Sequence, residues 1–106
     1  MSYSLVIITA PGSEEARAIG RALVEARLAA SVNVLPEVTS FYWWDGALQE
    51  GAEALLLAKT RTILVEPVIA FVRDRHSYVC PCVIATTIEA GNPDYLAWID
   101  AETGGT

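Results

Sequence analysis

The chain has 106 residues, of which 53% are hydrophobic, and its formal net charge is −6 at pH 7. This length suits a single domain spanning residues 1–106. The negative charge argues against binding to nucleic-acid phosphates or to an anionic membrane surface. A small domain buries only part of its surface, so the high apolar content favours self-association.

No targeting segment is expected at the N-terminus. The first residues lack a basic region, and the apolar run over residues 5–8 is too short for a signal-peptide core or a membrane span. The two cysteines, Cys80 and Cys82, do not form the disulfide framework of a secreted protein. A cytoplasmic protein with reduced thiols is therefore predicted.

The first strand and the first helix are predicted from the start of the chain. The stretch "SLVIITA" (residues 4–10) is a continuous apolar run rich in branched side chains, typical of a strand buried on both faces. Ser13 is the expected cap of the helix that follows. An apolar stripe should pack this helix on the sheet through Ala16, Ile19, Leu23 and Ala26.

A hairpin is predicted in the middle of the chain. The second strand covers residues 31–44, and Pro36 should produce a bulge, a bend or an edge within it. Asp45-Gly46 is a strong signal for a two-residue hairpin turn. The third strand is expected to run through residues 53–60.

The last third of the chain predicts a helix, a strand and a short final helix. The second helix should occupy most of residues 61–76, with Pro67 in its first turn or distorting that turn. The fourth strand is expected over residues 82–91. The final helix covers residues 92–100, with Asn92 as its cap, and the polar tail over residues 101–106 should fray.

The predicted order, β-α-β-β-α-β plus a final helix, is the split-βαβ or ferredoxin-like arrangement: an α+β fold in which helices cover one face of an antiparallel sheet. RNA-binding domains with this fold need basic character, which this acidic chain lacks. No nucleophile elbow, phosphate-binding glycine loop or metallohydrolase motif is present. We therefore assign no catalytic residue and do not expect an enzyme.

The stretch "HSYVCPCV" (residues 76–83) contains the only histidine and both cysteines. Cys80 and Cys82 would share one face of a strand, and with His76 they are candidate metal ligands. Thiolate and imidazole donors would favour Cu(I) or Zn(II) over Mg(II) or Ca(II). The alternative is that the cysteines are small packing residues and that His76 interacts with the end of a helix.

A second group of candidates concerns the surface between subunits. Trp43 and Trp44 should point to opposite faces of the hairpin, and an interface role is more typical of tryptophan than a ligand cage. Glu53, Lys59 and Tyr78 are candidates for a pocket between subunits. The alternative for these three residues is that they are solvated charges and a hydrogen-bonded phenol.

Four separated segments carry a resemblance to a known family: "RLAASVNVLPEVTSFYWWDG", "EALLLAKT", "HSYVCP" and "GNPDYLAWI". Together they resemble the CutA family of divalent-cation-tolerance proteins over nearly the whole chain. The resemblance implies a ferredoxin-like homotrimer in which strands of neighbouring subunits pair edge to edge. It also implies binding of copper or other divalent metals, a role in metal tolerance and response, and architectural similarity to the PII signalling trimers.

The chain departs from the family pattern at several positions. Ser31 stands where the family often has cysteine, and Val79 and Cys82 stand where it commonly has glutamate, while Cys80 is an additional thiol. We expect a homotrimer that requires no cofactor, with copper or zinc as candidate metals. The alternative is a PII-like module that binds a small anionic metabolite in the subunit cleft, with Lys59 as the countercharge.

Overall fold

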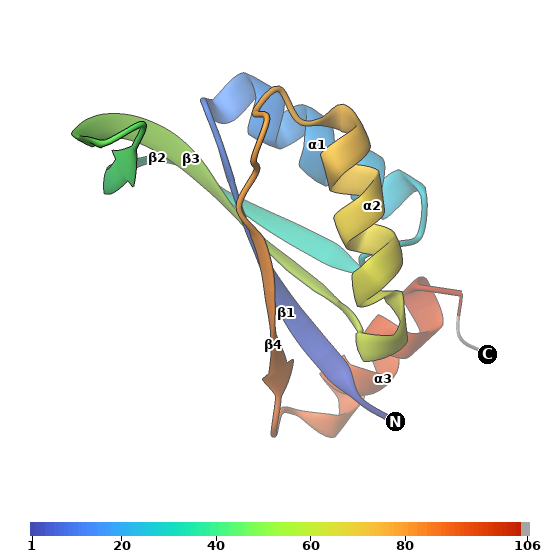
Figure 1. Cartoon of the computed structure of the whole chain (residues 1–106). Coiled ribbons are helices and arrows are strands. Elements are labelled where there is room, and N and C mark those ends of the chain that lie inside the picture. The colour runs from blue at the N-terminus through green and yellow to red at the C-terminus, as the bar shows by residue number, and fades with distance from the viewer. Residues whose placement is uncertain (105–106) are drawn as a thin grey trace.

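A four-stranded antiparallel sheet with strand order β2-β3-β1-β4 is the frame of the computed structural model, which describes residues 1–104 (Figure 1). The described residues also contain three α-helices and one 3₁₀ turn, as expected for an α+β fold. In chain order the elements are β1 (Tyr3–Ala10), α1 (Ser13–Glu25), β2 (Ser31–Trp44), β3 (Ala47–Arg61), η1 (Thr62–Leu64), α2 (Val65–Arg75), β4 (Val83–Ile88) and α3 (Pro93–Glu102).

Helices α1 and α2 cover one face of this sheet (Figure 1). Alternate strand residues such as Val6 and Leu56 are fully buried there against Leu23 of α1 and Val68 of α2. The intervening residues of β1 are only partly buried. The prediction of a first strand buried on both faces was therefore wrong for the single chain, because these two helices cover one face only.

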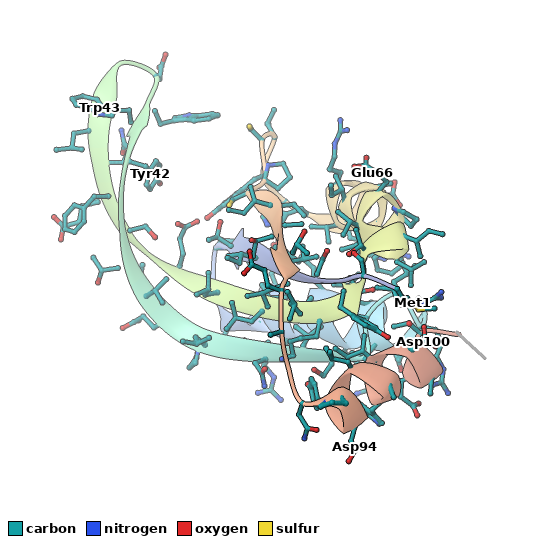
Figure 2. The ribbon with its side chains drawn as sticks, turned by 90° about the horizontal axis from the view of Figure 1, so that it is seen from below. Met1, Tyr42, Trp43, Glu66, Asp94 and Asp100 are labelled. Carbon is teal, nitrogen blue, oxygen red and sulfur yellow. The ribbon has the colours of Figure 1, made fainter. Side chains whose placement is uncertain are left out.

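Helix α3 lies on the opposite face, at one end of the sheet (Figure 2). The Tyr95 and Ser31 hydroxyl groups are 3.2 Å apart. Arg61 Nε donates to Thr103 Oγ1 at 2.8 Å and lies 3.8 Å from Asp100 Oδ1. The rest of this face keeps an apolar surface that is at least partly exposed in the single chain, formed by Leu5, Ile7, Leu35, Leu55, Leu57 and Ile84.

The β2–β3 hairpin extends beyond the other strands as a curved projection (Figures 1 and 2). We call residues 38–53 the arm, because β3 pairs with β1 only from Ala54 onward. The backbone φ angles of Asp45 and Gly46 are 52° and 76°, as a two-residue hairpin turn requires. A register shift between Leu35 and Val38 confirms the predicted bulge at Pro36, on a strand at the edge of the sheet.

Two proline effects predicted from the sequence are confirmed. The 3₁₀ turn precedes α2, which begins at Val65, so that Pro67 lies in the first helical turn. At α3, Pro93 occupies the first helical position, and the Asn92 side chain accepts a hydrogen bond from the Asp94 N–H at 3.1 Å.

Several element boundaries differ from the prediction, among them the start of β3 at Ala47 and the end of β4 at Ile88. Gly12, not Ser13, is the N-cap residue of α1, and it makes no side-chain cap. Strand β4 begins at Val83, after both cysteines. In the segment before it, Ser77 bonds to Glu15 of α1 and the Tyr78 N–H bonds to His76. Ala101 and Glu102 continue α3 instead of fraying. The last part of the predicted tail, residues 105–106, lies outside the described residues. No helix among residues 1–104 is both long and apolar enough to cross a membrane.

The hairpin turn generates a stability prediction with a matched control. Gly46 has a positive φ that L-residues rarely adopt, so Gly46→Ala should lower the free energy of unfolding by about 1 kcal/mol. Gly51 lies on the same arm without a positive φ, and an added Cβ would meet nothing within 4 Å. Gly51→Ala should therefore be neutral or slightly stabilising in denaturant unfolding. Equal destabilisation by the two substitutions would contradict the turn geometry.

Candidate functional site

The His76 side chain anchors the segment that follows α2. It is fully buried, and its Nε2 lies 2.6 Å from the carbonyl oxygen of Thr9 at the end of β1. The Tyr78 backbone N–H donates to His76 Nδ1 at 3.0 Å. Because Nδ1 accepts this bond, the ring proton lies on Nε2 and is donated to Thr9. Both nitrogens of the only histidine are thus already engaged.

Ser77 and Glu15 provide a second anchor, between this segment and the first turn of α1. The backbone N–H and the hydroxyl group of Ser77 each donate to Glu15 Oε2 at 3.0 Å. Partial burial acts to raise the pKa of the Glu15 carboxyl. The two hydrogen bonds from Ser77 outweigh this effect and lower the pKa of the carboxyl below its usual value.

Tyr78 connects the same segment to the arm. Its phenol donates to Glu53 Oε2 at 3.0 Å, across 25 residues of sequence. Burial of the phenol raises the pKa of Tyr78 to about 12, with the hydrogen bond and the negative charge of Glu53 contributing in the same direction. The phenol therefore stays protonated at neutral pH and holds one oxygen of the carboxylate.

A cleft of about 760 Å³ opens between the arm and the segment of residues 76–82, which we call the anchored loop. The loop contributes Tyr78, Cys80 and Cys82 to the lining. The arm contributes Glu53 and three aromatic side chains, those of Phe41, Tyr42 and Trp44. Four of the six residues predicted for a site thus meet at one cleft.

The predicted metal ligands are only partly brought together. Cys80 and Cys82 are both exposed in the loop, whereas the His76 side chain is buried beneath it. Among residues 1–104, no group of three or more His, Cys, Asp or Glu side chains could hold a metal ion. A single chain therefore presents two accessible thiols without a third donor.

Lys59 lies apart from the other two predicted cleft residues. Its Nζ donates to Asn33 Oδ1 on the neighbouring strand. Six residues separate it from Glu53 along β3, about 20 Å at ~3.3 Å per residue. Glu53 and Tyr78 are thus paired directly, and Lys59 is at the other end of the strand.

The aromatic wall of the cleft was only partly anticipated. The tryptophans do point to different sides, since Trp44 lines the cleft and Trp43 does not. The contribution of Tyr42 was missed, although alternate residues of a strand share a face, and Tyr42 is two residues before Trp44. The Glu15–Ser77 contact has no local sequence signal, because it joins residues 62 positions apart.

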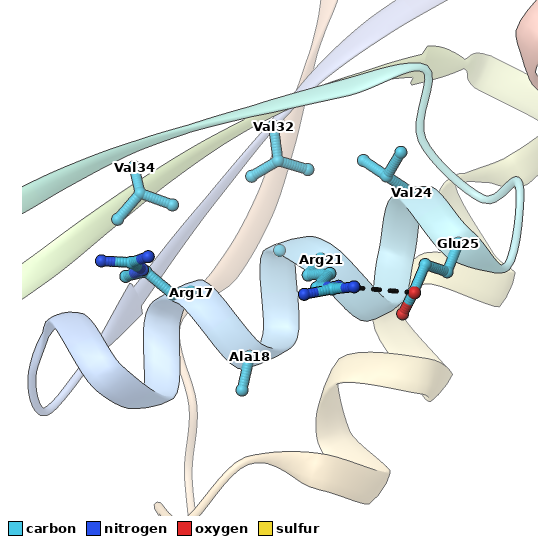
Figure 3. A pocket seen from close by; sticks show the side chains of 8 residues that line it. Arg17, Ala18, Arg21, Val24, Glu25, Val32 and Val34 are labelled. Atoms are coloured by element: carbon cyan, nitrogen blue, oxygen red, sulfur yellow. Dashed lines mark hydrogen bonds and ion pairs between the residues drawn. The ribbon is translucent and has the colours of Figure 1, made fainter.

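A second hollow, of about 530 Å³, lies between α1 and β2 and contains none of the predicted residues (Figure 3). Val32 and Val34 form its floor, and Arg21 at its rim pairs with Glu25 at 3.4 Å. Both members of this ion pair are largely exposed, so we regard the hollow as ordinary helix surface.

Comparison with known proteins gives one consistent family. The model of the CutA1 divalent ion tolerance protein family matches residues 4–102. Among curated relatives, Protein CutA of Mus musculus is 44% identical over 102 residues, covering 96% of this chain and 58% of the mouse protein. The divalent-cation tolerance protein CutA of Thermus thermophilus is 45% identical over 100 residues, covering 94% and 97% of the two chains.

The vertebrate relatives are longer than this chain, which spans between 55% and 65% of the mouse, Xenopus laevis and human proteins. Among solved structures, one described as the periplasmic divalent cation tolerance protein CutA from Archaeoglobus fulgidus has a TM-score of 0.93 at 39% identity, covering 95% of this chain and 98% of that one. CutA1 from Oryza sativa has a TM-score of 0.93 at 36% identity, covering 96% and 94%.

The Tyr78–Glu53 pair generates a pH prediction. Spectrophotometric titration should show one phenol, absent in Tyr78→Phe, with a pKa of about 12. Glu53→Gln removes the charge and should move this pKa toward 10.0, whereas Glu50→Gln, which removes a charge outside the cleft lining, should not. An unchanged titration in Glu53→Gln would contradict the pairing.

The same shift has a consequence for stability at alkaline pH. A pKa that is raised in the folded state means that the protonated phenol favours folding. This contribution is complete below pH 10 and is lost as the pH rises through about 12.

Proposed function

The chain belongs to the CutA1 divalent ion tolerance protein family, and from this membership we propose that it is a non-enzymatic homotrimer that takes part in divalent-metal tolerance and response. We further propose that residues 1–106 form one ferredoxin-like domain of this family, as the strand order β2-β3-β1-β4 supports. Its net charge of −6 and its free thiols suit a cytoplasmic location without nucleic-acid or membrane partners.

Uncovered apolar surface supports the proposed trimer. The sheet face opposite α1 and α2 carries leucine and isoleucine side chains that the single chain leaves partly exposed. Strands β2 and β4 are the two edges of the sheet, so their outer backbone groups are available to strands of another subunit. The arm adds exposed apolar side chains that do not line the cleft, Trp43 and Leu48. Assembly through these surfaces would bury them.

We propose Cys80 and Cys82 as the main ligands of a bound metal, with Cu(I) or Zn(II) as the candidate ions. Both thiols are exposed at one cleft, and hydrogen bonds from His76, Ser77 and Tyr78 hold the loop that carries them. His76 could act as an auxiliary ligand only by giving up its bond to Thr9 or to Tyr78. A neighbouring subunit would supply any further donors.

The alternative function, a PII-like module that binds a small anionic metabolite through Glu53, Lys59 and Tyr78, has less support. Lys59 lies at the far end of β3, and the residues that line the cleft include no basic side chain. An anion in this cleft would face the Glu53 carboxylate without a countercharge from the same chain.

The trimer is tested by light scattering of the purified protein, which should give about three times 11.4 kDa. Ile84→Lys places a charge on the uncovered sheet face and should lower this mass. Ile63→Lys, at an exposed apolar position outside the sheet, is the control and should leave it unchanged. A monomer mass for the wild-type protein would contradict the proposal.

The metal site is tested by Cu(I) and Zn(II) titration under reducing, anaerobic conditions. Cys80→Ser and Cys82→Ser should each weaken binding, and the wild-type affinity should fall at low pH as thiolates are protonated. Mg(II) serves as the control ion and should bind negligibly, because it prefers an octahedron of oxygen ligands. Equal affinity in the wild type and both variants would exclude this site.

A further inference from the structure

The cleft between the arm and the anchored loop carries negative charge that no group of the described chain neutralises. Within residues 1–104, Glu53 forms no ion pair, and its hydrogen-bond partner is the neutral phenol of Tyr78. The basic side chains of β3 lie at the other end of the strand and are engaged there, Lys59 with Asn33 and Arg61 with Thr103. A ligand that complements this cleft must therefore carry positive charge.

The phenol of Tyr78 stays protonated and therefore adds no second negative charge to the cleft. Burial is the main reason why its pKa rises to about 12, and the charges of Glu53 and Glu15 add to the effect. The part of the shift that comes from these charges favours a cation near the phenol oxygen, whereas the larger part that comes from burial does not.

Aromatic side chains form the other part of the cleft wall. Tyr42 and Trp44 lie on one face of β2, and their exposed fractions are 44% and 55%. Tyr78 closes the cleft from the loop side. Aromatic faces attract cations, most strongly when the cation is poorly hydrated. A volume of about 760 Å³ is within the usual range for small-molecule sites.

The composition of the wall also separates organic cations from metal ions. A hard metal ion needs several oxygen ligands, and no cluster of three acidic, histidine or cysteine side chains exists among residues 1–104. One carboxylate beside several aromatic rings instead matches the way proteins bind ammonium groups.

We propose that this cleft binds a small organic cation bearing an alkylammonium group, with Glu53 as the counterion and with Tyr42, Trp44 and Tyr78 around the charged head. This site is additional to the proposed metal role, because it requires neither thiol. It also reverses the sign of ligand charge expected for a PII-like sensor of an anionic metabolite.

The first test is calorimetric titration of the assembled wild-type protein with choline, in the presence of a chelator so that the result is independent of metal binding. The matched control is 3,3-dimethylbutan-1-ol, which has the shape of choline without its charge. Butylammonium and butan-1-ol form a second pair. We expect each cation to bind at least about tenfold more tightly than its neutral partner.

The second test uses paired variants of the arm. Glu53→Gln keeps the size of the side chain but removes its charge, and Trp44→Leu removes an aromatic face. Each should weaken choline binding by about tenfold. Glu50→Gln makes the same charge change on the same arm outside the cleft lining, and should leave the affinity within about twofold of wild type.

Several outcomes would overturn the proposal. Equal binding of choline and its neutral isostere would show that the cleft recognises apolar shape and not positive charge. No binding of either cation up to about 10 mM would show that the cleft is closed or filled by a neighbouring copy. Equal losses in Glu53→Gln and Glu50→Gln would show unspecific charge attraction. The comparison of charged and neutral probes needs only wild-type protein, so it remains decisive if a variant fails to fold.

Discussion

The imidazole of His76 is the contact on which the site depends, because it joins the end of α2 and the loop that follows it to the end of β1, 67 positions earlier in the sequence. The residue ends α2, its Nε2–H donates to Thr9 at the end of β1, and its Nδ1 accepts from the backbone of Tyr78. The ring is fully buried, so loss of either bond would leave an unsatisfied polar group in the interior. This arrangement fixes the direction in which the loop leaves the helix.

The position of the loop then determines the cleft. Ser77 is directed to Glu15 of α1, and Tyr78 reaches Glu53 at the base of the arm. The Thr9 N–H donates to the Cys82 carbonyl at 3.3 Å, which returns the chain to the sheet just before β4. The cleft is thus bounded on one side by the arm, which extends beyond the sheet, and on the other by the anchored loop, which is hydrogen-bonded to the end of β1. The proposed thiol and cation sites share this boundary, with thiols on the loop and the carboxylate on the arm.

Much of the fold was predictable because its signals are local. The hairpin turn follows from Asp45-Gly46, the start of α3 from Asn92-Pro93, and the late start of α2 from Pro67. The burial of the first strand was overestimated, because an apolar run does not show whether a second layer or another subunit covers each face. The sequence predicted the cysteines at the start of a strand, whereas they lie in the loop before it. Hydropathy does not show the hydrogen bonds that hold this loop.

The sequence predicted several residues of the site but not how they are arranged. Glu53, Tyr78, Cys80 and Cys82 were candidates from the sequence, and the fold brings them to one cleft. The separation of Lys59 from Glu53 follows from six positions of extended strand and was predictable. The choice of arm side chains that face the anchored loop depends on strand register and on the bulge at Pro36, which a single sequence specifies weakly. Contacts such as Ser77 to Glu15 join distant residues and required the structure.

The most direct test of this account is the protonation state of the single histidine, measured by ¹⁵N NMR of the ring nitrogens at neutral pH. Because the chain contains one histidine, the signals need no further assignment. A structural anchor predicts a neutral ring with the proton on Nε2, an unprotonated Nδ1, and slow exchange of the Nε2 proton with water. A ring that exchanges freely between tautomers, or that carries its proton on Nδ1, would contradict the central role given to His76.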